Sequence, residues 1–371
     1  MRSAGGGGVH LRRTGENVSE IGAFAALTGG AAGLEAVLAD LNRVGKRSRG
    51  WFGRAVREAY TWDAADRRTR DWYPQGITTT THASRPATQA GVSTDLDNVL
   101  AITWYAKERN GLAQGSRVTF YDRATARYRH VLLVVPVLRE SEDGEQQLKL
   151  EPLRVHAGGI VWAGPFLHIA ATARGFMTCR VDDILRIPDE VGDPAGRRLG
   201  IADDRVSSYG YRYVLPVRFA YRAESDSGVP RLRYSCLSLD TSSLPPVLIT
   251  GEFGRGDQTT RIARFPLDPV SLLPLLGNDG RAMPTDIDDS AVRRLQGVAR
   301  VQGTHYASVS HGPLLPGSVY AGAPGSFRGH HFAMPMGPED LSPDVGGDRL
   351  WSLSEYPGRR WIYSMDRAFF D

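Results

Sequence analysis

The stretch Leu350–Arg360, LWSLSEYPGRR, is a short apolar segment that ends in a polar residue and a tight turn, and RRWIYSMD continues it as a second apolar segment. The same pattern occurs four more times in the chain, as LAITWYAK at 100–107, LHIAATARG at 167–175, VLITGEFG at 247–254 and HYASVSHG at 305–312. Strand–turn–strand units repeated at this spacing are typical of a closed ring of small sheets. The sequence therefore predicts an all-β, five-bladed β-propeller, with six blades as the alternative.

The repeats begin near Tyr73, so residues 73–371 are predicted to form the propeller. Residues 1–18 are rich in Gly and Arg and predict a disordered leader, and residues 19–72 predict a short helical extension followed by a ring-closing segment. After RRWIYSMD only a few residues remain, so the last blade lacks an outer strand of its own. Since propellers remove open edges by closing the ring, we expect Trp51–Trp72 to supply that strand.

Bulk composition indicates a folded protein without a nucleic-acid or membrane role. Hydrophobic residues make up 41% and charged residues 23% of the 371 residues, and the net charge of +4 is scattered without a Lys/Arg run. No apolar stretch reaches membrane-spanning length, and acidic residues interrupt the Ala/Gly stretch near the N-terminus, so we expect a cytoplasmic protein. Cys179 and Cys236 fall in predicted strands, which favours buried free thiols. The oligomeric state is left open.

Four repeats open with a similar tetrapeptide, PQGI at 74–77, AGGI at 157–160, LQGV at 295–298 and PEDL at 338–341. These openings resemble the blades of NHL-repeat and SMP-30-like propellers, and the HAGGI and GPEDLS segments resemble uncharacterised actinobacterial propeller proteins. A cation content that is almost entirely Arg agrees with a GC-rich bacterial source. The SMP-30-like metal set of one Glu, two Asn and one Asp has no match here, since Asn is nearly absent from the repeats, so the resemblance implies the fold and not the lactonase mechanism.

Equivalent positions of the repeats should form rings around the propeller axis, where ligands bind at the mouth of the channel. Counted from the tetrapeptides, the first ring contains Gln75, Gly158, Tyr234, Gln296 and Glu339. Counted from the turn, the second ring contains Trp104, Thr172, Glu252, Ser310 and Glu355. Most of these residues are polar, which points to a ligand site.

Three residues are the predicted catalytic groups: Glu355, Glu252 and His156. Two convergent carboxylates in a concave site can divide acid and base work because burial and repulsion separate their pKa values, and His156, just before a predicted inner strand, suits a general base. Predicted substrate-binding residues are Gln75, Trp104, Tyr105, Arg174, Tyr234, Gln296, His311 and Glu339. The alternative is that each carboxylate pairs with an arginine such as Arg174, Arg212 or Arg360 and ties blades together.

Cofactor motifs are missing from the chain: no GxxxxGK[ST] occurs, GGAAG at 29–33 follows no predicted strand, and there is no G-x-S-x-G. We therefore expect no redox or nucleotide cofactor and no resident metal, with Ca²⁺ or Mg²⁺ held by Glu339, Asp340 and a histidine as the alternative. The predicted function is a cofactor-independent hydrolase, lyase or cyclase acting on a small molecule at the channel mouth, for example in secondary-metabolite biosynthesis. A non-catalytic ligand-binding or scaffold propeller and a glycosidase with paired carboxylates are the alternatives.

Overall fold

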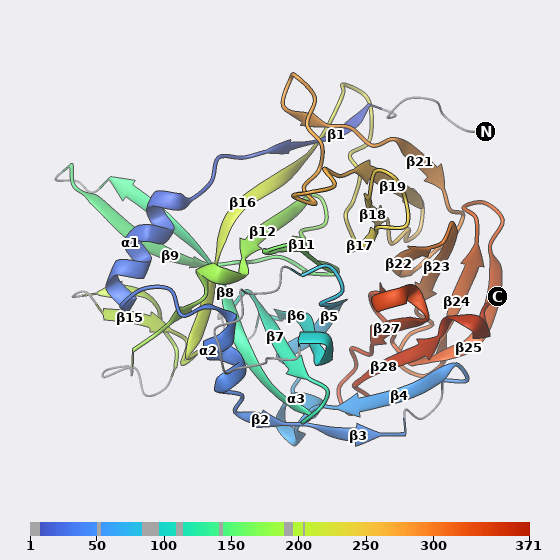
Figure 1. Ribbon diagram of the computed structural model, residues 1–371, viewed down its shortest axis with the longest axis horizontal. Coiled ribbons are helices and arrows are strands. Elements are labelled where there is room, and N and C mark those ends of the chain that lie inside the picture. The colour runs from blue at the N-terminus through green and yellow to red at the C-terminus, as the bar shows by residue number, and fades with distance from the viewer. Residues whose placement is uncertain are drawn as a thin grey trace.

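The computed structural model of the chain describes residues 8–49, 53–83, 96–108, 114–140, 144–188, 196–202 and 205–371. In this part of the chain β-strands dominate, and three short helices lie on the outside (Figure 1). The all-β prediction is confirmed. Several strands are nearly continuous buried runs, such as residues 99–104 and 247–251, which indicates that both faces of these strands are covered.

Five antiparallel meanders follow one another along the described residues. Meander 1 contains β5 (Trp72–Thr79), β6 (Val99–Ala106), β7 (Ser116–Asp122) and β8 (Arg127–Glu140), extended by β9 (Gln146–Pro152). Meander 2 contains β10 (Ile160–Ala163), β11 (Phe166–Ala170), β12 (Phe176–Arg180) and β16 (Tyr213–Ser225). Meander 3 contains β17 (Cys236–Asp240), β18 (Val247–Gly251), β19 (Arg261–Pro266) and β21 (Asp286–Asp289).

Meander 4 contains β22 (Leu295–Val301), β23 (Thr304–Val309), β24 (Pro316–Gly322) and β25 (Arg328–Met336). Meander 5 contains β26 (Ser342–Pro343), β27 (Arg349–Leu353), β28 (Trp361–Asp366), β4 (Val56–Thr61) and β3 (Lys46–Ser48). Short additional strands are β1 (Val9–Arg13), β2 (Arg43–Val44), β13 (Leu185–Arg186), β14 (Leu199–Ala202), β15 (Arg205–Ser208) and β20 (Arg281–Ala282).

The first strands of the meanders form a closed ring around a common centre. Strand β5 packs against β10, β10 against β17, β17 against β22, β22 against β26, and β26 against β5. This arrangement is that of a β-propeller, and the predicted propeller-type fold is confirmed. Only meanders 1 and 2 also share a sheet, because their outer strands β8 and β16 pair in parallel.

Glycines of the repeated tetrapeptides lie where the first strands come closest. A Cβ atom on Gly76 would lie 2.8 Å from the carbonyl carbon of Gly159, and one on Gly159 would lie 2.3 Å from the backbone nitrogen of Leu237. On Gly297, a Cβ atom would lie 2.4 Å from the nitrogen of Leu341. Contacts this short with backbone atoms exclude any side chain, so the recurrent glycine of the sequence reflects backbone packing at the axis.

Asp340 occupies the corresponding position of meander 5 and joins the first strands of three meanders. Its side chain is fully buried, and Oδ2 accepts hydrogen bonds from the backbone N–H groups of Ile77, at 3.3 Å, and of Ile160, at 3.2 Å. Burial raises the pKa of Asp340 well above its usual range, although these backbone donors act in the opposite direction. Asp340 is therefore part of the scaffold that closes the centre of the ring.

The outer strand of meander 5 comes from the N-terminal part of the chain, as expected. Strand β4 pairs antiparallel with β28, from Trp361 opposite Thr61 to Met365 opposite Val56, so this prediction is confirmed. Residues 56–60, VREAY, belong to the ring-closing part of the predicted 19–72 segment and form β4 itself. Burial of Ala59 and Tyr60 between neighbouring strands stabilises this strand.

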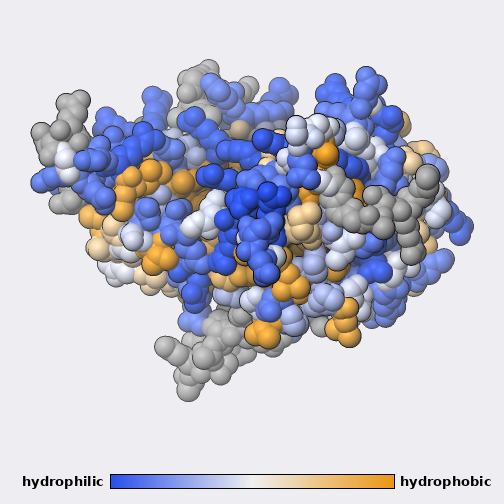
Figure 2. Space-filling view, turned by 90° about the horizontal axis from the view of Figure 1, so that it is seen from above, coloured by the Kyte–Doolittle hydropathy of each residue, from blue (hydrophilic) through white to orange (hydrophobic). Residues whose placement is uncertain are grey.

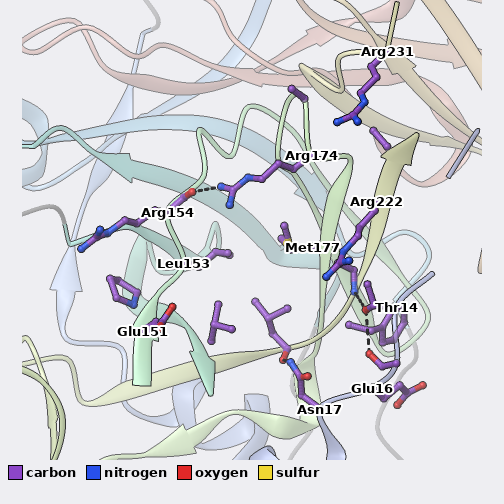
Figure 3. A pocket seen from close by; sticks show the side chains of 18 residues that line it. Thr14, Glu16, Asn17, Glu151, Leu153, Arg154, Arg174, Met177, Arg222 and Arg231 are labelled. Atoms are coloured by element: carbon purple, nitrogen blue, oxygen red, sulfur yellow. Dashed lines mark hydrogen bonds between the residues drawn. The ribbon is translucent and has the colours of Figure 1, made fainter. Parts of the chain in front are cut away.

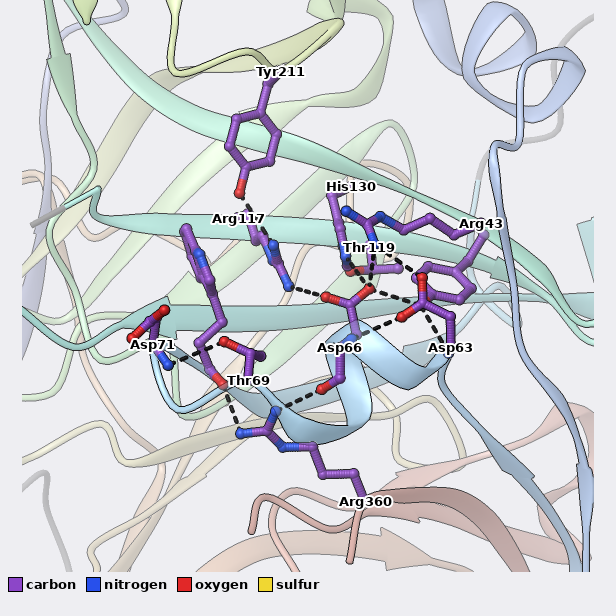
Figure 4. Close-up of polar contacts among 12 residues, drawn as sticks. Arg43, Asp63, Asp66, Thr69, Asp71, Arg117, Thr119, His130, Tyr211 and Arg360 are labelled. Atoms are coloured by element: carbon purple, nitrogen blue, oxygen red, sulfur yellow. Dashed lines mark hydrogen bonds and ion pairs between the residues drawn. The ribbon is translucent and has the colours of Figure 1, made fainter. Parts of the chain in front are cut away.

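A buried polar network joins this closing segment to meander 1 (Figure 4). Helix α3 (Ala64–Arg68) places Asp66 where its carboxylate accepts hydrogen bonds from Arg117, at 3.0 Å, and from the Tyr128 hydroxyl, at 2.7 Å, and contacts His130 Nε2 at 2.9 Å. Arg360 from meander 5 donates to the carbonyl oxygens of Asp66 and Trp72. The two ends of the ring are therefore held together by α3 and its partners.

The N-terminal segment is packed on meanders 1 and 2. Strand β1 pairs with β16, with Val9 and Leu11 buried, so the structure has a paired strand inside the segment predicted as a leader, of which residues 1–7 lie outside the described residues. Helices α1 (Val18–Thr28) and α2 (Gly33–Ala39) follow, as the helical extension predicts. They bury Phe24 and Val37 against the outer strands.

The surface shown in Figure 2 is mainly hydrophilic, and its apolar residues form small separate patches. Among the described helices, none has the length and apolar content required to span a membrane. Cys179 and Cys236 are buried free thiols, as predicted.

Candidate functional site

One edge of the ring gathers polar residues from several meanders. In each meander the beginning of the first strand and the end of the second strand lie at the same edge, because the two strands are antiparallel. We define the rim cluster as Gln75, Tyr105, His156, Glu339 and Glu355. The structure brings these five predicted site residues together, from meanders 1 and 5 and the segment before β10.

Glu355 follows β27 and is half-buried at the edge of meander 5. Its Oε2 accepts a hydrogen bond from Gln75 Nε2 at 3.1 Å, which links meander 5 to meander 1. Burial raises the pKa of Glu355, and this effect outweighs the opposite contributions of Tyr356, Gln75 and the cationic Lys107. The carboxylate is therefore a stronger base than a solvated glutamate.

Glu339 is more deeply buried than Glu355, with 2% of its surface exposed. Gln296 Nε2 donates to Glu339 Oε1 at 3.4 Å, and within the described residues neither Glu339 nor Glu355 forms an ion pair with Lys or Arg. Burial first, and then the negative charges of Glu355 and Asp340, raise the pKa of Glu339 well above its usual range. These conditions favour a protonated Glu339 beside a more exposed Glu355.

Aromatic rings cover one side of the rim cluster. Tyr105 stacks on Tyr73, with ring centroids 5.7 Å apart, and lies 4.5 Å from the ring of His156. Lys107 Nζ lies 3.8 Å from the centre of the Tyr73 ring. Desolvation and the positive charge of Lys107 lower the pKa of His156, which favours a neutral imidazole. The ring of Tyr105 lies between His156 and the two carboxyl groups that act on it, and flat surfaces beside carboxyl groups suit a small organic ligand.

The residues predicted for the second ring do not all occupy equivalent positions in the structure, because some of them are displaced by one residue along their strand. Gly297 pairs with Ser308, so Ser310 lies two residues beyond that pair. Cys236 pairs with Gly251, so Glu252 lies only one residue beyond the corresponding pair. Because side chains alternate along a strand, this difference places Glu252 on the opposite face from Ser310.

In meander 1 the same count separates Trp104 from Tyr105. Ile77 pairs with Ile102, which puts Gly76 opposite Thr103, and Tyr105 two residues beyond it. Trp104 is therefore turned away from the rim cluster and is fully buried, with its ring centre 4.6 Å from that of Trp62. Tyr105, and not Trp104, occupies the position equivalent to Glu355.

Glu252 is held by Arg261 within meander 3. Arg261 Nε donates to Oε2 at 3.0 Å and Nη2 donates to Oε1 at 2.9 Å, while the backbone N–H of Arg233 donates to Oε1 at 3.0 Å. Burial alone would raise the pKa of this fully buried carboxyl group, but the hydrogen bonds from Arg261 and its neighbours lower it. The expected alternative of a carboxylate paired with an arginine thus describes Glu252, although with Arg261 as the partner.

Three further predicted binding residues lie outside the rim cluster. Tyr234 is completely buried in an apolar cluster, and its backbone pairs with Thr172. Arg174 is exposed and lines a cavity beside the outer strands β9, β12 and β16. The Nε2 atom of His311 lies 2.8 Å from the hydroxyl of Ser318 in β24. Reading the sequence did not single out Tyr73 or Lys107, which cover the cluster.

The described residues contain no group of three or more His, Cys, Asp and Glu side chains arranged to hold a metal ion. Glu339 and Asp340 are adjacent in sequence, but the Asp340 carboxylate is directed to backbone N–H groups of β5 and β10. Activity without a metal stays a prediction.

Comparison with known proteins gives only distant likenesses. No protein-family model and no curated protein matches the sequence. Among solved structures, a GH43_1 enzyme from Xanthomonas citri is similar with 12% identity and a TM-score of 0.34, over 82% of this chain and 90% of that chain. A gluconolactonase from Xanthomonas campestris has 13% identity and a TM-score of 0.36, over 87% and 97%. The Dos1 propeller has 10% identity and a TM-score of 0.27, over 78% and 72%.

Proposed function

We propose that the chain is a five-bladed propeller and that its rim cluster is the active site of a cofactor-independent acid/base enzyme acting on a small molecule. The observation that carries this proposal is the pair of glutamates, Glu339 and Glu355, buried close together without a cationic ion-pair partner. Glu252, a fully buried carboxylate outside the rim cluster, is held differently, by the guanidinium of Arg261. A cytoplasmic location and a part in secondary metabolism belong to the same proposal.

The two carboxyl groups are suited to different roles. Glu339 has the more strongly raised pKa and serves as the general acid, since it holds a proton at neutral pH. Glu355 is more exposed, accepts a hydrogen bond from Gln75, and serves as the general base. Proton transfer between such a pair and a substrate supports hydrolysis, elimination or cyclisation, and glycoside cleavage is one case. Tyr105 and His156 would orient the substrate.

A panel of chromogenic esters, lactones and aryl glycosides tests the proposal. Turnover by the native protein should decrease about 10²–10⁴-fold in Glu355→Gln and in Glu339→Gln, because each variant removes a proton-transfer group. The melting temperature of Glu355→Gln should stay within about 2 °C, because that side chain is half-buried and hydrogen-bonded to an amide. Glu224→Gln, at a partly exposed carboxylate of β16, is the control and should keep full turnover.

A different result would favour the alternative function. If Glu355→Gln lowers the melting temperature by about 5 °C or more and changes no turnover, the carboxylates serve to hold the ring together. Binding of a panel compound without turnover, reduced equally by both Gln variants, would support a non-catalytic ligand-binding propeller. Treatment with a chelator should leave turnover unchanged.

A further inference from the structure

A cavity of about 1170 Å³ lies beside the outer strands of meanders 1 and 2 (Figure 3). Strands β8 and β16 pair in parallel only as far as Val134 and Pro216. Beyond these residues the strands separate, since β8 continues with β9 and β16 continues with β12. Val135 and Val217, the next residue of each strand, line the cavity. The cavity therefore occupies the space between two diverging parallel strands.

Four exposed arginines line this cavity: Arg154, Arg174, Arg222 and Arg231. In the described part of the chain none of them forms an ion pair, and Arg174 donates a hydrogen bond to the carbonyl oxygen of Arg154. Like charges gathered in one concave site raise the local positive potential. Guanidinium groups without a carboxylate partner are suited to bind an oxyanion by paired hydrogen bonds.

The two carboxylates of the lining do not neutralise these arginines, because each has a partner of its own. Glu16 accepts hydrogen bonds from Arg218, at 2.7 Å, and from Arg13, at 2.6 Å. Glu151 accepts one from Arg139 at 2.5 Å. The cavity thus retains a net positive charge.

Apolar side chains also line this cavity. Leu153, Val217 and Phe219 are buried, whereas Met177 of β12 and Val135 of β8 are half-buried and keep part of their surface exposed. Figure 3 shows Leu153, Met177 and Arg174 lining the same cavity. A small inorganic ion would contact the arginines alone, whereas a ligand with an apolar body would also cover the exposed surface of Met177 and Val135.

We propose that this cavity binds an oxyanion carried on an alkyl chain, with the carboxylate or phosphate at the arginines and the chain over Met177 and Val135. The site is separate from the rim cluster and does not depend on the proposed enzymatic function. The arginines recognise the anionic head group, and both a carboxylate and a phosphate can accept paired hydrogen bonds from a guanidinium group.

Calorimetric titration of the full chain with octanoate and with octyl phosphate tests this inference. Both anions should bind, and the tighter one identifies the head group. Inorganic phosphate and 1-octanol should each bind about tenfold more weakly or not at all, because each lacks one half of the ligand. If inorganic phosphate binds as tightly as octyl phosphate, the apolar lining residues do not contribute to binding. If 1-octanol binds as tightly as octyl phosphate, the arginines do not contribute.

Two variants and one control locate the binding. Arg174→Gln and Arg222→Gln should each weaken octyl phosphate binding about tenfold, since each removes charge-assisted hydrogen bonds from an exposed side chain. Arg180→Gln, on β12 and ion-paired with Asp182 outside the cavity, should bind like the native protein. Unchanged affinity in both cavity variants, or the same loss in Arg180→Gln, would refute the site, as would no binding of either anion at about 10 mM.

Discussion

Replacing Arg261 by Met should destabilise the protein strongly, although the residue is remote from the rim cluster. The guanidinium donates to both oxygens of the Glu252 carboxylate, which is fully buried, and also to the carbonyl oxygens of Pro230 and Arg231. Removing one partner of a buried ion pair leaves the other charge uncompensated, which costs about 3–5 kcal/mol of unfolding free energy. The backbone N–H of Arg233 remains as a donor and keeps the loss within that range.

The loss should depend on pH in a defined direction. In the native protein the pKa of Glu252 is lowered, so the carboxylate contributes stability above its unfolded value of 4.5 and that contribution is lost as the pH falls. In Arg261→Met, burial is no longer opposed by the guanidinium and raises the pKa of Glu252. The ionised form is then the penalised one, so the difference between the two proteins should be larger at pH 8 than near pH 4.5.

Urea unfolding followed by circular dichroism at both pH values measures this difference. Arg264→Met is the matched control, since Arg264 lies on the same strand but pairs with the partly exposed Asp286 and Asp288, and it should cost about 1 kcal/mol or less. The double variant Arg261→Met/Glu252→Gln should be less destabilised than the sum of the single variants by about 2 kcal/mol. A loss below about 1 kcal/mol in Arg261→Met, or one that does not change with pH, would refute this account of Glu252.

Two further predictions concern the scaffold. Gly159→Ala should lower the free energy of unfolding in urea by about 3 kcal/mol or more, because its Cβ atom would lie 2.3 Å from a backbone atom. Gly22→Ala in α1, whose Cβ atom would have nothing within 4 Å, should stabilise the protein slightly. Equal effects of the two substitutions would contradict the close packing at the axis. Burial lowers the pKa of His130 to about 4, of His168 to about 3 and of His305 to about 4. Because the unfolded chain takes up these protons below pH 6.5 and the native state does not, the urea midpoint should fall steadily from pH 7 to pH 4. A flat profile would show that these rings are charged in the native state.

The repeat pattern carried most of the information about the fold. Short apolar segments that end in a polar residue and a turn bury their apolar face only by packing on equivalent neighbours, so the LWSLSEYPGRR pattern and its four relatives indicate an all-β ring. The glycine of PQGI and LQGV is a local signature of close backbone approach, and the structure shows that approach at Gly76 and Gly297. The need for a ring-closing strand also follows from the chain alone, because an open edge is unfavourable.

The site could be predicted only in part, because local sequence does not fix the register between strands. Bulges at Gln75 and Gln296 and their absence at the start of β17 shift the repeats by one residue relative to one another. A shift of one residue turns a side chain to the opposite face, which is why Trp104, Tyr234 and Glu252 are buried away from the cluster that contains Tyr105 and Glu355.

The chain by itself therefore determined the strands, their repetition and the small residues at the axis, since these depend on side-chain periodicity and backbone sterics within each repeat. Which carboxylates meet and which are paired was decided by tertiary structure alone. Arg261 lies nine residues beyond Glu252 and is brought to it by the β18–β19 pairing, whereas Glu355 lies beside Gln75 only because the ring closes. The pKa of a buried carboxyl group depends on its neighbours in space, and these cannot be identified from the order of the 371 residues alone.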